Sequence, residues 1–278
     1  MFFPLHDQKN APVKIVPVIS YLIIALCFLV QLYQISIAFS SDSKVRSTHF
    51  AYRHGMVPHV YFSGTTVYQI GPPEFHLNEQ DLQRAEQAKF GSSEREMYDL
   101  LVLHSSPFWI WLMPITSLFL HAGVMHLLTN VWFFWIFSDN VEERFGAPLF
   151  LVFYLITGMF SSFVHAYLNQ QSYIPLVGAS GAVSSVMGAY IALFPRHRVT
   201  SYFCPAWFFI RRVDVPAVLV LGLYLLLNIL SMTRASDGIG PNVAFDAHIG
   251  CFVAGFLFAH LHKAVLTAGN SSPARSEE

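Results

Sequence analysis

Long apolar stretches alternate with polar segments along this chain. A helix needs about 20 predominantly apolar residues to cross the hydrocarbon core of a bilayer. Stretches that approach or reach this length predict six transmembrane helices, at residues 14–39, 121–138, 148–168, 180–195, 215–231 and 247–265. The pattern therefore predicts an all-α, polytopic membrane protein, a bundle of six transmembrane helices with a long first outer loop.

The apolar stretch from residue 107 to residue 137 is too long for one straight span. As a single helix it would be about 46 Å long, against a hydrocarbon core of roughly 30 Å. Pro114 would also interrupt the hydrogen bonding of such a helix. We expect residues 107–120 to form an interfacial or partly inserted segment, and the second span to begin near His121.

The basic residues predict the orientation of these spans. They concentrate in short segments that lie on the same side as both termini, which the positive-inside rule makes cytoplasmic. The predicted organisation is a cytoplasmic N-terminal segment (1–13), the first span (14–39), a long extracytoplasmic loop (40–106), a core with five further spans (107–265) and a flexible cytoplasmic tail (266–278). Within the loop, residues 77–99 are polar and have a helical pattern.

Composition supports the membrane prediction. Hydrophobic residues make up 54% of the chain and charged residues 12%, whereas soluble domains carry about 25% charged residues. The net charge of -1 gives no indication of nucleic-acid binding. The three cysteines show neither a CxxC motif nor a Cys/His spacing typical of zinc sites.

Ser180 stands at the predicted start of the fourth span, between Gly178 and Gly181. Glycine on either side permits close backbone approach and an unusual turn. Taken alone, this serine fits either a helix N-cap or a nucleophile. It is not the GxSxG elbow of α/β-hydrolases, because residue 182 is alanine and no strand precedes it.

His248 opens the sixth span, at the same side of the membrane as Ser180 in the predicted topology. A catalytic serine needs a base for its proton, and neutral imidazole suits this role. A lone histidine also fits a buried residue with satisfied hydrogen bonds. Asp246 is two residues away and faces elsewhere on a helix. We therefore favour a Ser180–His248 dyad, with Asp246 in the loop.

The second span carries His126 and Asn130, four residues apart and hence on one helical face. Both could donate to a developing oxyanion, together with the backbone N–H of Ser180. The alternative is a polar pair that holds helices together. His121 lies on another face and is expected to order the loop above. Two histidines and an asparagine without a carboxylate make poor zinc coordination, so no metal is predicted.

Small residues line the fourth and sixth spans and predict close packing between helices. Those of the sixth span are Gly250, Ala254, Gly255 and Ala259, and Gly188 is a candidate in the fourth. Such packing would bring Ser180 and His248 within hydrogen-bonding reach.

Taken together, these motifs resemble the rhomboid family of intramembrane serine proteases, in its basic six-helix form. The resemblance covers roughly residues 107–265, and residues 139–146 also resemble the family's segment after the second span. The matching residues are His121, His126 and Asn130, then Gly178, Ser180 and Gly181, and finally His248 and Gly255.

The resemblance implies a rhomboid-like helical bundle in which Ser180 is the nucleophile and His248 the general base. It also implies that His126 and Asn130 assist the Ser180 backbone in stabilising the oxyanion. Neither a metal nor an organic cofactor is implied. The implied partners are the lipid bilayer and transmembrane protein substrates, cleaved near their outer ends at small residues in helices that unwind easily.

Three positions depart from the family pattern. Members often have a Trp-Arg pair in the first loop, whereas residues 109–112 read Trp-Ile-Trp-Leu. Some members stack an aromatic residue under the catalytic histidine, where this chain has Ser184, so His248 must be held differently. Cys251 replaces a common glycine and predicts a slightly wider contact between the fourth and sixth spans.

Two other functions are compatible with parts of the pattern. One is a catalytically inactive rhomboid-like protein that binds transmembrane clients without cutting them. The other is a transporter or channel with histidines as a proton relay, which the near absence of charged residues in the spans disfavours. The compact core and short tail favour a bacterial inner (plasma) membrane.

Overall fold

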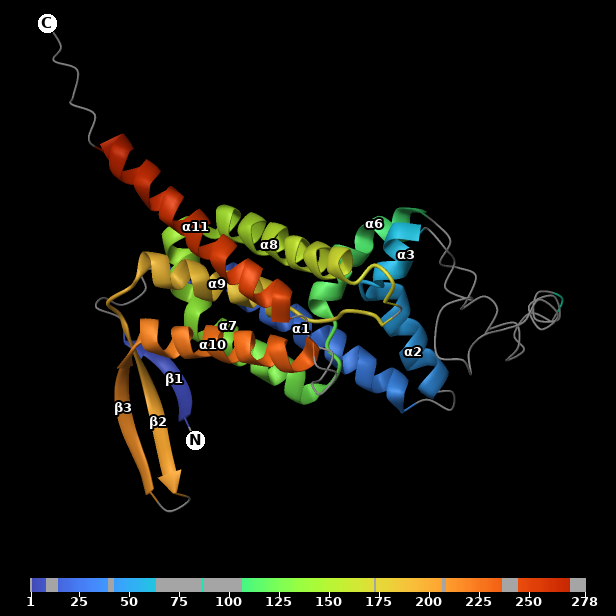
Figure 1. Cartoon of the computed structure of the whole chain (residues 1–278), viewed down its shortest axis with the longest axis horizontal. Helices are drawn as coiled ribbons and strands as arrows, with labels where there is room; N and C mark the ends of the chain where they lie inside the picture. Colours follow the sequence, from blue (N-terminus) through green and yellow to red (C-terminus); the bar gives the residue numbers. More distant parts are fainter. Residues whose placement is uncertain are drawn as a thin grey trace, which may run out of the picture. The chain divides into compact units, whose positions relative to one another are not determined.

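The computed structural model describes residues 2–8, 15–39, 43–63, 87, 107–172, 174–206, 209–236 and 245–270. Most of these residues are helical, as predicted (Figure 1). The helices are α1 (Val18–Ala38), α2 (Ser43–His54), α3 (Pro58–Ser63), α6 (Pro107–Thr116), η3 (Ser117–Phe119), α7 (Val124–Phe145), α8 (Ala147–Leu168), α9 (Ser180–Leu193), α10 (Ala217–Ser236) and α11 (Phe245–Asn270). The strands are β1 (Phe2–Gln8), β2 (Arg198–Ala206) and β3 (Phe209–Pro216).

Each predicted span corresponds to one helix. Within the described part of the chain, α1, α8 and residues Ala247–Val265 of α11 are long and apolar enough to cross a membrane by themselves. The bent pair Phe108–Phe119 and Val124–Phe145 counts as a fourth span if taken as one. Helix α9 and the apolar part of α10 are shorter. The chain is therefore a multi-pass membrane protein, and a count of six spans stays a prediction.

The structure confirms that the apolar stretch after residue 107 is not one straight helix. The two pieces are bent by 77° at the break between them. The break comes later than Pro114, which lies inside α6, and the next helix begins at Val124 rather than near His121. Leu120 has an extended backbone conformation, and α7 begins only at Val124. His121 therefore lies before the helix in which the sequence analysis placed it.

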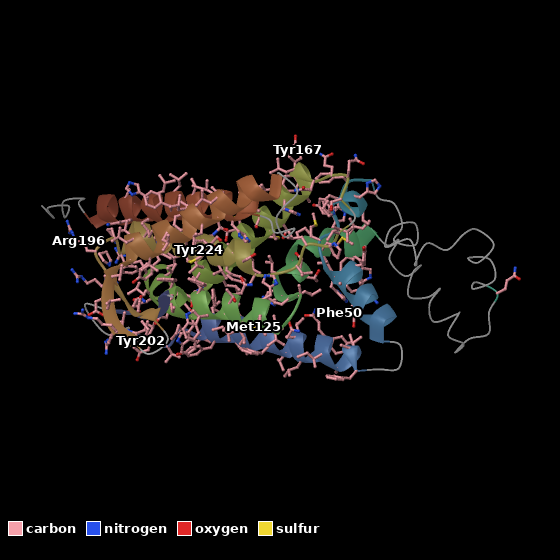
Figure 2. All side chains as sticks on the ribbon, turned by 60° about the horizontal axis from the view of Figure 1, so that its bottom comes forward. Phe50, Met125, Tyr167, Arg196, Tyr202 and Tyr224 are labelled. Carbon is pink, nitrogen blue, oxygen red and sulfur yellow. The ribbon has the colours of Figure 1, made fainter. Side chains whose placement is uncertain are left out.

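The described chain divides into two compact units. The first comprises Met1–Leu22, Val131–Thr157 and Gly181–Glu278. It contains a three-stranded antiparallel sheet in the order β1-β2-β3, in which Phe2 pairs with Phe203 and Arg198 with Pro216. The sequence analysis placed these segments on the cytoplasmic side and predicted no strand in them. Arg196 and Tyr202 are exposed here (Figure 2).

A fully buried carboxylate holds the N-terminus of α1 in this first unit. Glu142 accepts hydrogen bonds from the backbone N–H of Ile19 (2.9 Å), from the backbone N–H of Ser20 (2.8 Å) and from the Ser20 hydroxyl (2.7 Å). The first N–H groups of a helix have no partner within the helix, and the helix dipole favours negative charge there. Glu142 therefore supplies an N-terminal cap from α7.

A second buried carboxylate ties β1 to the helices. Asp7 accepts hydrogen bonds from the Asn140 amide (2.7 Å) and from the Tyr190 hydroxyl (2.9 Å). The His197 Nδ1 atom lies 3.9 Å from the same carboxylate. These bonds connect the strand with α7 and α9, so the first residues of the chain belong to the fold.

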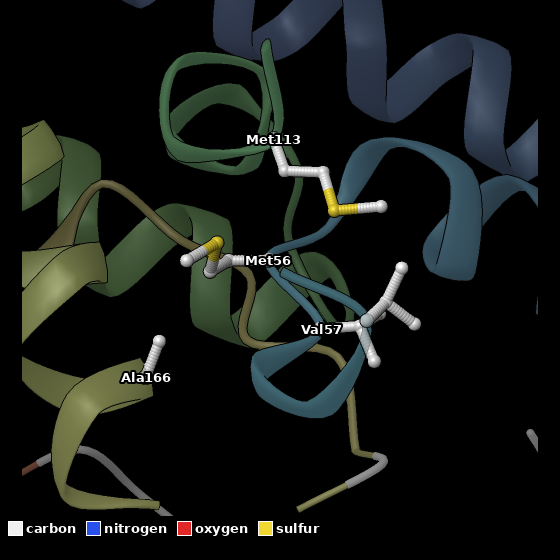
Figure 3. Packing of buried hydrophobic residues seen from close by; sticks show 5 residues of the cluster. Met56, Val57, Met113 and Ala166 are labelled. Carbon is white, nitrogen blue, oxygen red and sulfur yellow. The ribbon is translucent and has the colours of Figure 1, made fainter. Parts of the chain in front are cut away.

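The second unit comprises Ile23–Asn130 and Gly158–Ser180. Its apolar core includes residues of the α2–α3 turn, α3, α6 and the end of α8 (Figure 3), namely Met56, Val57, Val60, Met113 and Ala166. Part of the predicted outer loop is thus folded into α2 and α3. The remainder of that loop, including residues 77–99, lies outside the described residues apart from residue 87.

The guanidinium of Arg53 lies over the ring of Trp109, with Cζ 4.9 Å from the ring centroid. An arginine and an indole ring in this arrangement attract each other through the ring quadrupole. Residues 109–112 lack the adjacent Trp-Arg pair of the family, but Arg53 of α2 contacts Trp109 through space. Thr116 at the end of α6 adds a hydroxyl bond to the carbonyl of His54 (2.7 Å).

Candidate active site

Ser180 is the first residue of α9, and backbone hydrogen bonds hold the segment that leads to it. Leu176 and Met56 form an antiparallel bridge with N···O distances of 2.8 and 2.9 Å. Two residues after Leu176, the N–H of Gly178 donates to the carbonyl of Ser117 (2.9 Å). The approach to Ser180 is therefore fixed by the α2–α3 turn and by η3.

Gly178 has φ +129°, a backbone conformation that is essentially restricted to glycine. A Cβ atom at this position would lie 2.8 Å from Cε1 and 3.1 Å from Nε2 of His126, and 3.8 Å from the Ser180 hydroxyl oxygen. The imidazole of His126 thus packs directly on the backbone beside Ser180. The structure brings together His126, Gly178 and Ser180, which the sequence predicted to share one site.

The hydrogen bonds of His126 indicate which ring nitrogen carries the proton. Nδ1 faces the backbone N–H of Ala122 at 3.4 Å, and an N–H group can only donate. In the neutral ring Nδ1 is then the acceptor, and the proton is on Nε2. Nε2 is the ring nitrogen that lies near Gly178, so the His126 ring places a hydrogen-bond donor close to the backbone beside Ser180.

Asn130 is buried on the same helix, and its Nδ2 donates to the carbonyl of His126 (2.9 Å). One of the two amide N–H donors is therefore engaged within α7. His121 is buried before the helix, and its ring lies edge-on to that of His126 with centroids 5.3 Å apart. The backbone of His121 exchanges two hydrogen bonds with the Gln34 amide, which connects the loop to α1.

His248 lies in the first unit, in the first turn of α11, and only 7% of it is exposed. Its Nδ1 is 3.0 Å from Oδ1 of Asn228 on α10. The sequence analysis missed Asn228, although an asparagine within an apolar membrane helix is itself a signal of function. Helix α11 begins at Phe245, so Asp246 is helical and not, as predicted, a loop residue.

Helices α9 and α11 approach each other closely in this unit. A Cβ atom at Gly255 would overlap the backbone carbonyl of Ser185, and one at Gly188 would overlap that of Phe252. The Ser185 hydroxyl also donates to the carbonyl of Cys251 (2.9 Å). Cys251 thus lies within a close contact between α9 and α11, and a width relative to other family members stays a prediction.

The predicted small-residue positions differ in what they contact. Gly255 is needed for close approach, and Ala259 and Gly181 are buried. Gly250 has open space where a Cβ would be, so among the described residues it makes no close helix contact, contrary to the prediction. The described residues include no group of three His, Cys, Asp or Glu side chains that could hold a metal ion.

The family model of the Rhomboid domain matches residues 109–264. The chain belongs to the rhomboid family. Among curated relatives, the human presenilin-associated rhomboid-like protein, mitochondrial, is 29% identical over 110 residues, which cover 38% of this chain and 29% of the relative. Rhomboid protease GluP of Bacillus subtilis is 31% identical over 157 residues, 54% of this chain and 25% of the relative.

The similarity also extends to a plant protein. RHOMBOID-like protein 6, mitochondrial, of Arabidopsis thaliana is 40% identical over 78 residues, which cover 28% of this chain and 25% of the relative. Each of these three alignments covers less than a third of the relative. The family membership of this chain is shown, whereas its activity is a separate question.

Proposed function

We propose that this chain is an intramembrane serine endopeptidase that hydrolyses peptide bonds in or near transmembrane segments of other membrane proteins. In this proposal Ser180 is the nucleophile and His248 its general base. His126, Asn130 and the backbone N–H of Ser180 stabilise the oxyanion. The rhomboid membership and the name of the relative from Bacillus, a rhomboid protease, support this function.

The observation that carries the proposal is the placement of the His126 ring on Gly178, beside the Ser180 hydroxyl. Preorganised donors near a nucleophile stabilise the negative charge that develops on a carbonyl oxygen during attack. Nε2–H of His126 and the backbone N–H of Ser180, at the start of α9, would provide two such donors. Asn130 would contribute its second amide N–H.

The pairing of Ser180 with His248 is supported by chemistry and by family membership. A serine hydroxyl needs a base to take its proton, and a neutral imidazole suits that role. The match to the Rhomboid domain covers both residues.

The chemistry then follows from the roles of these groups. Nε2 of His248 takes the proton of the Ser180 hydroxyl while the oxygen attacks the substrate carbonyl carbon. The resulting tetrahedral oxyanion is stabilised by the donors named above. His248 returns the proton to the leaving amine, which gives an acyl-enzyme, and water repeats the sequence to release the acid. A carbonyl within a helix is hydrogen-bonded and shielded, so we expect substrates with weak helix formers at the cut.

The partners in this proposal are transmembrane protein substrates and the lipid bilayer, with no role for nucleic acid. The relatives include proteins named as mitochondrial as well as one from a bacterium. They therefore give no support to our prediction of a bacterial inner membrane. The alternative function is an inactive rhomboid-like protein that binds transmembrane clients.

The test is labelling by a fluorophosphonate probe together with cleavage of a single-span membrane protein that has small residues near the outer end of its helix. Ser180→Ala and His248→Ala should each abolish both signals. Ser161→Ala, which removes another buried serine hydroxyl, should retain them. Folded wild-type protein that neither reacts nor cleaves, or a labelled Ser180→Ala variant, would contradict the proposal and favour the client-binding alternative.

A further inference from the structure

Three hydrogen bonds form a chain from α9 to α11 within the first unit. One joins α9 to α10, one lies within α10, and one joins α10 to His248 of α11. The Ser184 hydroxyl is 2.8 Å from the hydroxyl of Tyr224, which is labelled in Figure 2. The Asn228 Nδ2 donates to the backbone carbonyl of Tyr224 (2.9 Å). The Asn228 Oδ1 lies 3.0 Å from His248 Nδ1. None of these groups except His248 has a role in the mechanism above.

The bond to Tyr224 fixes the orientation of the Asn228 amide. Oxygen and nitrogen of an amide are hard to distinguish by shape, and the hydrogen-bond network must assign them. A backbone carbonyl can only accept, so the atom of Asn228 that faces Tyr224 must be the NH₂ group. The oxygen of the amide consequently faces His248.

This orientation determines the protonation state of the histidine ring. The Asn228 oxygen can only accept, so Nδ1 of His248 must be the donor. In a neutral ring with the proton on Nδ1, the lone pair is on Nε2. Asn228 and His248 are each 7% exposed. Water therefore competes little for this bond, and leaving either polar group without its partner would be costly.

We propose that Asn228 is a positioning residue that holds His248 in the Nδ1–H tautomer and fixes the ring for proton transfer at Nε2. Tyr224 and Ser184 in turn hold the α10 segment that carries Asn228. The inference rests on the proposed protease function, because it assigns Asn228 a role through the base. In this proposal Asn228 acts through His248 and not on the reacting atoms. The competing explanation is a polar tie between two membrane helices with no influence on the chemistry.

Two variants separate these explanations. Asn228→Leu keeps a side chain of similar size without an acceptor, and Asn228→Asp keeps the acceptor oxygen. The assay is cleavage of the single-span substrate in liposomes, with kcat and KM determined separately. General-base catalysis contributes about 10²–10⁴-fold to a rate, and we expect Asn228→Leu to lose roughly 10- to 100-fold in kcat. KM should change less than about twofold, and Asn228→Asp should recover most of the lost rate.

A matched control is Asn140→Leu, which removes another buried asparagine of the same unit. Asn140 donates to Asp7 and contacts neither His248 nor α10 in the hydrogen bonds described above. Its kcat should stay within about twofold of wild type. An equal loss of kcat in Asn140→Leu and Asn228→Leu, or an Asn228→Leu variant as fast as active wild type, would overturn the proposal.

The histidine tautomer gives a readout that does not depend on activity. Protein with ¹⁵N-labelled histidines in liposomes is compared with a His248→Gln variant, and the difference spectrum isolates the His248 nitrogens. We expect a protonated Nδ1 in wild type and loss of that signal in Asn228→Leu. A protonated Nε2 in wild type would overturn the inference. Inactive wild type with a protonated Nδ1 would overturn the protease function and leave the positioning of His248 by Asn228 intact.

Discussion

Under the proposed protease function, Gly178→Ala should lower cleavage activity by displacing the His126 ring. Gly178 combines φ +129° with direct contact to this imidazole. The added methyl would lie 2.8 Å from the ring carbon Cε1, whereas carbon atoms in contact are optimally about 3.5–4.0 Å apart. The ring would therefore have to move by roughly 0.7–1.2 Å.

The expected magnitude follows from two separate costs. A non-glycine residue in such a backbone conformation costs about 1–3 kcal/mol, which lowers the free energy of unfolding. A catalytic donor must be held within about 0.5 Å of its productive position, so a displaced ring would lose the oxyanion contact that we propose for His126. Loss of one oxyanion donor lowers kcat by about 10²–10³-fold. We expect a loss in that range for Gly178→Ala.

The assay is a double-mutant cycle with Gly178→Ala, His126→Ala and the combined variant, measured by cleavage of the single-span substrate. If the methyl acts by displacing His126, the combined variant should be about as slow as His126→Ala alone. Gly123→Ala is the matched control, because a Cβ atom at Gly123 would meet nothing within 4 Å. Thermal unfolding in detergent separates a loss of fold from a loss of chemistry.

Two results would refute this reasoning. Losses that multiply in the combined variant would show that Gly178→Ala acts independently of His126. A Gly178→Ala enzyme with the kcat of wild type would show that the His126 donor is unnecessary or that the ring adapts without cost. Reduced activity in Gly123→Ala of the same size would point to a general sensitivity of this part of the chain.

Two further predictions concern stability and helix packing. Glu142→Gln places an NH₂ group against the N–H donors of α1, including that of Ser20. It should lower the free energy of unfolding by about 2–4 kcal/mol. An unchanged midpoint of thermal unfolding would show that the cap does not contribute to stability. Gly255→Val collides with the carbonyl of Ser185 and should cost about 1–3 kcal/mol together with most of the cleavage activity. Gly222→Ala is the control, because a Cβ atom there would meet nothing within 4 Å, and it should retain both stability and cleavage activity. Equal losses in Gly222→Ala and Gly255→Val would contradict the packing argument.

The sequence predicts the membrane helices and the Ser180 region well, because both depend on local patterns. Apolar length locates the helices, and the length limit of a bilayer span identifies the bend after residue 107. The spacing of His126 and the glycines around Ser180 leads to residues that the structure places together. The pairing of Ser180 with His248 and their catalytic roles stay predictions.

The missed features depend on contacts between distant segments. The sheet joins β1 to strands about 200 residues further along the chain, and its short strands carry no hydropathy signal for a membrane span. The substitution at Ser184 predicted that His248 must be held differently from family members with an aromatic residue there. The sequence alone could not identify Asn228 as the residue that contacts His248, because that contact depends on how α10 and α11 face each other. Gly250 matched a small-residue pattern, and only the packing shows open space beside it.

The segment that leads to Ser180 is held by contacts that do not depend on the family's first-loop motif. The bridge between Met56 and Leu176 and the bond from Gly178 to Ser117 involve only backbone atoms, so they impose few requirements on side chains. The size of a side chain is restricted where two backbone segments come closest. A Cβ atom at Gly55 would lie 2.9 Å from the Pro175 side chain, so this turn needs glycine. Residues 55 and 56, in the loop between the first and second predicted spans, therefore support the residues that precede Ser180.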